Sequence, residues 1–312
     1  MNRWTSARTA VAAALMTASL AACGTSTPAA GDSSTSGGSY PVSIGTGTAT
    51  VTLSATPTRI VSLSASATED LFAIGAGSQV VAVDKDSDFP ANAPHTQLDA
   101  YQLNAEAVAS YKPDLVVEAG LTPAQVGQLT QLHIPVLIEP AATTLNDAYA
   151  QIADLGKATG HVSDAAALVT SMKSKVASII ASTPKTTSTY YYELDPTYYS
   201  VTSSTFVGQL FKMLGLTSVA DSAKGAAAAG GYPQLSGEYV LKSNPGYVFL
   251  ADTICCGQNA AKVGARPGWS AIGAVSGGRV VALNDDIASR WGPRVVDLLQ
   301  TIADAIKSHP VK

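Results

Sequence analysis

The longest amphipathic pattern in the chain lies near its middle, where apolar residues recur at steps of three and four. It follows Gly160 and opens with Ser163, a residue type that favours the N-cap of a helix. Asp164 suits the positive end of the helix dipole, and Pro184 stops the pattern. The apolar positions are Ala165, Leu168, Val169, Met172, Val176, Ile179 and Ile180. This spacing predicts a helix from Ser163 to about Ser182 with one buried face.

The stretches before and after this helix repeat one another. Residues 103–119 and 235–251 align without a gap, and six of the seventeen positions are identical. Each copy predicts a short helix that begins near Asn104 or Ser236, then a turn at proline and a buried strand. Such a duplication predicts two similarly built α/β lobes on either side of the helix.

Strand and helix patterns alternate through both halves of the chain. In the first half we expect a hairpin at 42–53, strands at 59–63, 80–83, 115–117 and 134–138, and helices at 69–74, 123–132 and 145–159. In the second half we expect strands at 189–193, 247–250 and 280–283, and helices at 205–214, 269–275 and 295–307. The predicted fold class is α/β, with two Rossmann-like lobes of mostly parallel strands joined by a single long helix. Ligands of such sheets gather beyond the carboxyl ends of the strands, so a cleft between the lobes is the expected binding site.

The amino terminus has the composition of an export signal followed by a tether. Arg3 and Arg8 precede an apolar run over residues 10–20, which is too short for a permanent membrane helix. The sequence Leu20-Ala-Ala-Cys-Gly24 resembles the lipobox of bacterial lipoproteins, which implies cleavage before Cys23 and a lipid on that residue. The alternative is an ordinary secretory signal with an incidental cysteine. The Gly, Ser, Thr, Ala and Pro residues that follow predict a flexible tether.

The expected organisation therefore has five parts. They are a signal peptide at 1–22, a lipidated Cys23 with its tether at 23–40, a lobe at 41–160, the bridging helix at 161–183 and a second lobe at 184–312. This organisation predicts a monomer outside the cytoplasm, anchored to the cell membrane by its lipid.

Composition limits the class of partner. The chain is 46% hydrophobic and only 13% charged, so its 312 residues are able to form two ordinary cores. Its net charge of −4 argues against nucleic acid, because neutralising phosphates requires clustered Lys and Arg.

Several short motifs occur in a fixed order along the chain. They are Pro57-Thr-Arg-Ile-Val-Ser-Leu63, Thr68-Glu69, Asp88-Phe-Pro90, Leu103-Asn-Ala-Glu106, Lys112-Pro-Asp-Leu-Val-Val117, Gly231-Tyr-Pro-Gln-Leu-Ser236, Glu238 and Ser289-Arg-Trp-Gly-Pro-Arg294. In these motifs the chain resembles the substrate-binding proteins of ABC importers for cobalamin and ferric siderophores, over about residues 56–307. The resemblance implies a periplasmic-binding-protein fold with two lobes and a rigid bridging helix. It also implies that the protein is not an enzyme, needs no cofactor, captures a metal chelate in the interlobe cleft and delivers it to a permease.

In this family, a glutamate on each lobe docks onto arginine pockets of the permease. By motif position these residues are Glu106 and Glu238, which the internal repeat also aligns. Two carboxylates held apart by a rigid body would set the orientation of docking by complementary charge. The alternative is that each glutamate only stabilises the first turn of its helix.

Six residues are candidates for ligand contact. Two tyrosines precede the two docking motifs, near places where the resemblance implies aromatic ligand contacts in cobalamin-binding members, and the other four residues lie in loops after predicted strands. Aromatic rings suit a bulky chelate because they bury much area at low entropic cost. The arginine is available to pair with an anionic group on the ligand. The alternatives are half-buried loop tyrosines and a surface arginine. Lys85 and Asp86 stand where some cobalamin binders carry a ring, so the cargo stays open between cobalamin and a ferric siderophore. The six candidates are Tyr101, Tyr198, Tyr199, Tyr232, Arg290 and Trp291.

Two adjacent cysteines follow the predicted strand at 247–250. Cys255 and Cys256 form a vicinal disulfide, two free thiols or a two-thiolate metal site, and the sequence leaves these three open. The histidines do not converge in the predicted elements, so no bare-metal site is expected. They are His95, His133, His161 and His309.

Three other functions compete with chelate transport. A haem-binding lipoprotein differs only in its cargo. A secreted hydrolase is less favoured, because the chain lacks a Gly-x-Ser-x-Gly elbow followed by Asp and His, and also lacks His-Glu-x-x-His and phosphate-loop motifs. A lipid-anchored adhesion or sensor protein would bind no chelate.

Overall fold

Residues 39–46 and 49–311 are described by the structure, a computed structural model. The predicted signal peptide, Cys23 and all but the last two residues of the tether lie outside this part of the chain. The described chain begins with the expected hairpin, in which β1 (Val42–Thr46) pairs antiparallel with β2 (Ala49–Leu53). Tyr40 attaches the segment before β1 to the end of α4 (Leu145–Thr159), because its hydroxyl donates a hydrogen bond to the carbonyl of Ala158 at 2.8 Å.

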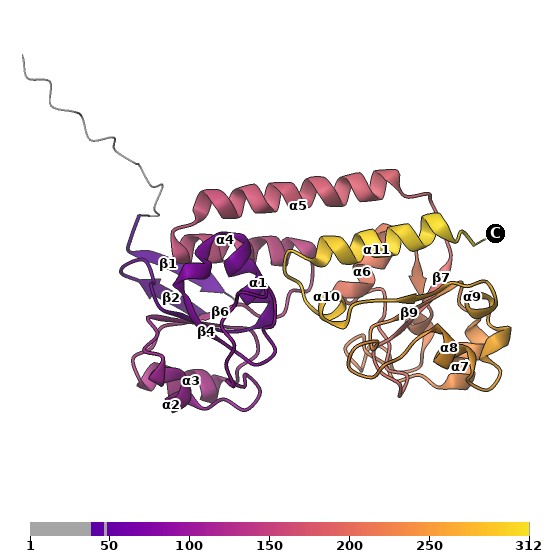
Figure 1. The fold of residues 1–312 in the computed structure, drawn as a ribbon, viewed down its shortest axis with the longest axis horizontal. Helices are drawn as coiled ribbons and strands as arrows, with labels where there is room; N and C mark the ends of the chain where they lie inside the picture. Colours follow the sequence, from indigo (N-terminus) through magenta and orange to yellow (C-terminus); the bar gives the residue numbers. More distant parts are fainter. Residues whose placement is uncertain (1–38, 47–48, 312) are drawn as a thin grey trace, which may run out of the picture. The chain divides into compact units, whose positions relative to one another are not determined.

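The first lobe, here called the N-lobe, contains a four-stranded parallel sheet in the order β4-β3-β5-β6 (Figure 1). All residues of β3 and β5 are buried, as expected of central strands covered on both faces. The strands are β3 (Ile60–Leu63), β4 (Val80–Val83), β5 (Leu115–Glu118) and β6 (Val136–Ile138). The helices are α1 (Ala65–Ala73), the 3₁₀ turn η1 (Ala76–Gln79), α2 (Ala105–Ser110), α3 (Pro123–Gln131) and α4 (Leu145–Thr159).

The second lobe, the C-lobe, repeats the plan with a parallel sheet in the order β10-β9-β7-β8 (Figure 1). Its strands are β7 (Thr189–Glu193), β8 (Thr217–Ser218), β9 (Tyr247–Leu250) and β10 (Val280–Ala282). Its helices are α6 (Phe206–Met213), η2 (Val219–Ser222), α7 (Gly237–Ser243), α8 (Ala260–Gly264), η3 (Trp269–Ala271), α9 (Gly273–Ser276), α10 (Asp285–Ser289) and α11 (Val295–Ser308). The α/β class with two parallel sheets is therefore confirmed.

The bridging helix is α5 (Val162–Ser182), close to the predicted range. Ser163 does not cap it, because the helix begins one residue earlier and His161 occupies the cap position, where its ring contacts the Asp164 carboxylate at 3.3 Å and makes no capping bond to the helix backbone. The reason is the short turn before it: α4 ends at Thr159, and only two residues lie between the helices, Gly160 with a left-handed backbone (φ +79) and His161. Like the other described helices, α5 is not long and apolar enough to cross a membrane.

Other differences from the prediction concern where helices begin, one divided helix and several short elements. Helix α1 begins at Ala65 rather than at Glu69, because the Ser64 hydroxyl accepts a hydrogen bond from the Ala67 N–H and caps the helix. The helix predicted at 269–275 is divided into η3 and α9. The short elements β8, α8 and α10 had no periodic signal in the sequence. By contrast, the repeat helices have the predicted side-chain caps, Asn104 and Ser236.

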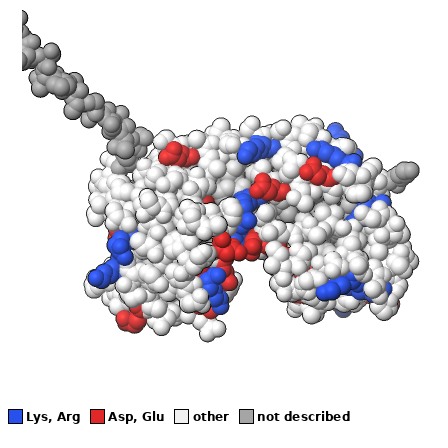
Figure 2. Space-filling view, in the orientation of Figure 1, with Lys and Arg blue, Asp and Glu red and all other residues white. Residues whose placement is uncertain are grey.

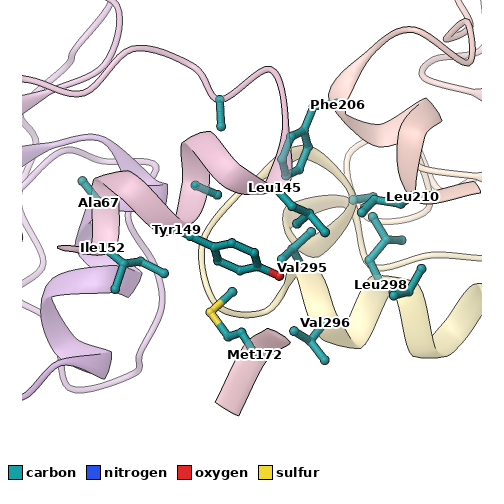
Figure 3. Close-up of a cluster of buried hydrophobic side chains, with 14 of the residues drawn as sticks. Ala67, Leu145, Tyr149, Ile152, Met172, Phe206, Leu210, Val295, Val296 and Leu298 are labelled. Carbon is teal, nitrogen blue, oxygen red and sulfur yellow. The ribbon is translucent and has the colours of Figure 1, made fainter. Parts of the chain in front are cut away.

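A continuous apolar core connects the two lobes beside the bridging helix. Figure 3 shows Tyr149 of α4, Met172 of α5, Phe206 of α6 and Val295 of α11 in one buried cluster. Helix α5 contacts α4 of the N-lobe and α11 of the C-lobe, so elements of both lobes pack against the bridging helix. A packed core of this kind resists bending, so the connection between the lobes is stiffer than a lone helix.

The buried carboxyl of Glu139, directly after β6, predicts a pH dependence of stability. Burial, and secondly the charge of Asp154, raise its pKa to about 8 from the ordinary 4.5. The folded protein therefore holds a proton on Glu139 that the unfolded chain releases, and this proton binding stabilises the folded state. The stabilisation is complete below about pH 4 and is lost as the pH rises through 8. Between pH 5 and pH 9, we expect the free energy of unfolding to fall less for Glu139→Gln than for the wild type. The difference between the two losses should be about 1–3 kcal/mol, measured by thermal or urea unfolding.

The matched control for this experiment is Glu106→Gln, which changes an exposed glutamate of the same lobe. It should follow the wild-type profile. Identical pH profiles for Glu139→Gln and the wild type would show that Glu139 is ionised in the folded state.

Candidate ligand-binding cleft

A cavity of about 560 Å³ lies at the carboxyl ends of the N-lobe strands. The segments after β3, β4, β5 and β6 contribute Ser64, Asp84, Gly120 and Ala141 to its wall. The opposite wall is the segment after β10, residues 286–291. The space-filling view shows acidic side chains in the hollow between the lobes (Figure 2). The cavity is therefore where the strand-end rule places a ligand, between the two lobes.

Two aromatic residues far apart in the sequence line this cavity. Tyr101 is 84% exposed, and its backbone N–H donates to the Asp99 carboxylate at 2.8 Å. Trp291 is half-buried, and its backbone N–H donates to the Ser66 hydroxyl at 3.1 Å. The structure thus brings two of the six candidate residues to one cavity with their backbones fixed by hydrogen bonds. Two aromatic rings in the lining of one cavity are able to bury the apolar surface of a flat ligand.

The cavity wall depends on an acidic residue that the sequence analysis did not select as a site residue. Glu69 of α1 has a side chain that is only 1% exposed, and it pairs with two arginines of the C-terminal segment. Arg294 donates two hydrogen bonds to it, at 3.0 and 2.5 Å, and Arg290 donates one at 3.2 Å. Arg294 also stacks its guanidinium on the Phe89 ring, 4.0 Å from the centroid. Glu69 therefore fastens residues 290–294 to α1.

Arg290 lines the cavity, but protein acceptors occupy its side chain. Nη1 donates to Glu69 and to Asp88, the latter at 2.8 Å. Nη2 donates to the Asp86 carbonyl and to the Asp286 carboxylate, both at 2.9 Å. The guanidinium has four terminal N–H groups, and these four bonds use all of them. An anionic ligand group would have to displace one of these acceptors to bind a terminal nitrogen of Arg290.

The three other candidate tyrosines lie outside the cavity wall. Tyr198 stacks on Trp269 with 5.9 Å between ring centroids, and Arg266 lies over its ring at 5.5 Å. Tyr199 and Tyr232 are exposed, and Tyr199 is held in an isolated β-bridge with Gln234. The loop after β7 therefore folds back onto its own lobe rather than toward the N-lobe strands.

A second buried ion pair lies at the carboxyl end of strand β7 in the C-lobe. Glu193, the last residue of β7, has a fully buried side chain and accepts two hydrogen bonds from Arg266, both at 2.5 Å. Burial, and secondly the charge of Glu193, raise the pKa of nearby Asp252 to about 7. Glu193 ends a buried strand and Asp252 lies two residues after another, and an acidic residue at such a place is the signal in the sequence that could have singled them out. This network explains why the C-lobe strand ends contribute less to the cavity.

Cys255 and Cys256 are exposed free thiols in the structure. The Asp285 carboxylate holds their loop by accepting hydrogen bonds from the backbone N–H groups of Thr253, Ile254 and Cys255, at 2.8–2.9 Å. Burial, and secondly the neighbouring thiol, raise the pKa of Cys255 to about 12, which keeps its thiol protonated at neutral pH. Within the described residues, no three or more His, Cys, Asp and Glu side chains are grouped to hold a metal ion.

The two glutamates expected at a permease occupy equivalent places in the lobes. Glu106 lies in the first turn of α2 and Glu238 in the first turn of α7, and both are exposed. A separate hollow of about 450 Å³ lies beside Glu106, lined by residues of α2 and α3 and by Leu132.

Comparison with known proteins adds independent information on this architecture. Residues 60–287, which include both parallel sheets, match the sequence model of a family described as periplasmic binding protein. A relative from Bacillus subtilis, described as the uncharacterized ABC transporter substrate-binding lipoprotein YvrC, is 32% identical over 269 residues, which cover 82% of each chain. A cobalamin-binding protein of Halobacterium salinarum is 28% identical over 279 residues, which cover 84% of this chain and 72% of the relative.

A solved structure supports the same fold. It is described as a possible iron-binding (periplasmic solute-binding) protein from Staphylococcus epidermidis. It matches with a TM-score of 0.68 at 26% identity, over 81% of this chain and 99% of that one.

The pairing of Glu69 with two arginines predicts a large effect of removing its charge. Glu69→Gln leaves two partly buried guanidiniums without their shared carboxylate, so we expect a loss of about 2–4 kcal/mol in the free energy of unfolding. Urea unfolding measures it, and Glu106→Gln is the control because that glutamate is exposed. A loss below about 0.5 kcal/mol, the usual size for a surface substitution, would show that the pairing does not hold the wall.

Proposed function

Because the chain belongs to the periplasmic binding protein family and is an ABC transporter substrate-binding protein, we propose that it captures cobalamin or a ferric siderophore between its lobes and delivers it to a permease. The observation that carries the proposal is the cavity at the strand ends, whose lining includes the aromatic residues Tyr101 and Trp291. Its volume of about 560 Å³ lies in the usual range for small-molecule sites. The cobalamin-binding relative supports the choice of cargo, and haem is the alternative.

Binding would bury the Tyr101 ring, which is mostly exposed, against the chelate while Trp291 supports the other side. A chelate that extends past the cavity has further aromatic contacts available from the C-lobe loops, at Tyr198, Tyr199 and Tyr232. Arg290 acts in this proposal as a wall residue whose charge its carboxylate partners neutralise. The shared apolar core and the Glu69 ion pairs oppose a wide hinge motion, so the lobes close only modestly on the ligand.

The finer parts of the proposal concern location and delivery. A lipid on Cys23 would hold the protein at the outer face of the cell membrane, and the tether would let the monomeric binding domain reach its permease. Glu106 and Glu238 would then dock on basic pockets of the permease, one from each lobe. Support for the anchor comes from the lipobox-like sequence and from the relative described as a lipoprotein.

A ligand titration tests the proposal directly. The soluble chain from residue 24 retains two tryptophans, the buried Trp269 and the cavity residue Trp291, so ligand quenching reports mainly on the cavity. We expect tight quenching and thermal stabilisation by cyanocobalamin or by one ferric siderophore. Tyr101→Ala should weaken that binding about tenfold, because a stacked ring contributes on the order of 1–1.5 kcal/mol.

Met213→Ala is the control for this titration, because Met213 is an exposed apolar residue of α6 that does not line the cavity. Its affinity should equal that of the wild type. Silence across cobalamin, ferric hydroxamate, ferric catecholate and haem would remove the main support for chelate transport and favour the sensor or hydrolase alternatives.

The docking proposal predicts a separation of binding from transport. Glu106→Arg and Glu238→Arg place like charges against basic pockets, so each should reduce ligand uptake by cells at least tenfold, and the double variant should abolish it. Ligand affinity of the purified variants should stay within twofold of the wild type, since neither residue lines the cavity between the lobes. Normal uptake by the double variant would refute the docking role.

A further inference from the structure

The charges around the cavity indicate which class of chelate it accepts. Resting on the proposed function, we infer that the cleft selects a chelate without net negative charge, one that presents amide or ammonium groups to its wall rather than carboxylates or catecholates. The inference concerns selectivity within the cavity described above.

The cavity wall contains more carboxylates than cations. Asp84, Asp86 and Asp286 face one guanidinium, that of Arg290, which gives the wall a formal charge of −2. Asp86 is exposed, and its carboxylate makes no hydrogen bond or ion pair within the part of the chain that the structure describes. It is therefore open to a donor on the ligand.

The single cation of the wall does not offset this charge for a ligand. Arg290 directs its terminal N–H groups to Glu69, Asp88, Asp286 and the Asp86 carbonyl, at 2.8–3.2 Å. Its charge is shared among three carboxylates and its donors are used. An anion that approached would find no free N–H group on its two terminal nitrogens.

The neighbouring cations are occupied in the same way. Lys85 pairs with Asp99 at 2.6 Å, and Arg294 pairs with Glu69 at 2.5 Å. No cation on the two segments that carry the cavity acids, 84–88 and 285–294, is without a carboxylate partner in the structure. An anionic chelate would lose its hydration here and gain no compensating charge.

A ligand with N–H donors meets the opposite situation. The Asp86 carboxylate is a strong acceptor for amide or ammonium groups, and charge-assisted hydrogen bonds are about twice as strong as neutral ones. The same acids that favour such a ligand repel an anion, so a single set of residues provides attraction and exclusion. On this basis the cleft discriminates by charge among metal chelates of similar size.

Two matched pairs of probes test the inference on the soluble chain from residue 24. In the macrocycle pair, cyanocobalamin carries amide side chains and haemin carries carboxylates. In the siderophore pair, ferric desferrioxamine B is a cation and ferric enterobactin is an anion. We expect the non-anionic member of whichever pair binds to have at least a tenfold lower Kd, and the preference to shrink as the salt concentration rises.

Charge reversal at Asp86 gives a second, independent readout. Asp86→Lys should shift the ratio of the two affinities toward the anionic member by about tenfold, since two unit charges change at close range. The matched control is Asp304→Lys on α11, which makes the same change of net charge at an exposed residue outside the cavity wall and should leave the ratio unchanged. Thermal unfolding checks that both variants are folded.

The outcomes separate the inference from the proposed function. Tighter binding of the anionic member in either pair, or an unchanged ratio in Asp86→Lys, overturns the charge selection and leaves chelate capture in place. Failure of all four probes to bind overturns chelate capture itself, and the inference with it.

Discussion

The arrangement of the cleft depends on one buried carboxylate, that of Glu69. Moving a carboxylate out of water costs several kcal/mol, and the cost is offset only by well-placed opposite charge and hydrogen bonds. Arg290 and Arg294 supply both, and they come from a segment more than 200 residues away in the sequence. The contact is also tight: a Cβ atom on Gly292 would lie 3.2 Å from Glu69, so a side chain there would press on the ion pair. The pairing therefore fixes where Trp291 and Arg290 stand on the cavity wall.

The two lobes share a plan but use their strand ends differently. In the N-lobe the four strand ends open onto the cavity. In the C-lobe, Arg266 neutralises Glu193 and packs on Tyr198 and Trp269, so that edge is filled by its own side chains. The C-lobe contributes to the cavity through residues 286–291, which reach the N-lobe with the help of Glu69. The two lobes of the repeat therefore differ: the strand ends of the N-lobe line the cavity, and those of the C-lobe are covered by side chains of the C-lobe itself.

This asymmetry has a consequence for recognition. Arg290 belongs both to the ion pairs that fasten the segment to the N-lobe and to the lining of the cavity, so the stability of the wall and the charge of the cavity are linked. The carboxylates that hold Arg290 share the charge of the one cation that lines the cavity, and this is how the link arises. A ligand contact by this arginine was a reasonable expectation from its position beside Trp291, and only its hydrogen bonds show that its donors are in use.

Local patterns in the sequence were enough to determine the α/β class, the bridging helix, the duplicated helix–turn–strand unit and the caps at Asn104 and Ser236. These features follow from periodicity and capping chemistry within a few neighbouring residues, which the sequence states directly. The tertiary structure alone decided which strand ends open onto the cavity, that Tyr101 and Trp291 line one cavity while Tyr198 does not, and what Glu69 does. Those outcomes depend on ion pairs and packing between residues far apart in the chain, and no local pattern records such partners.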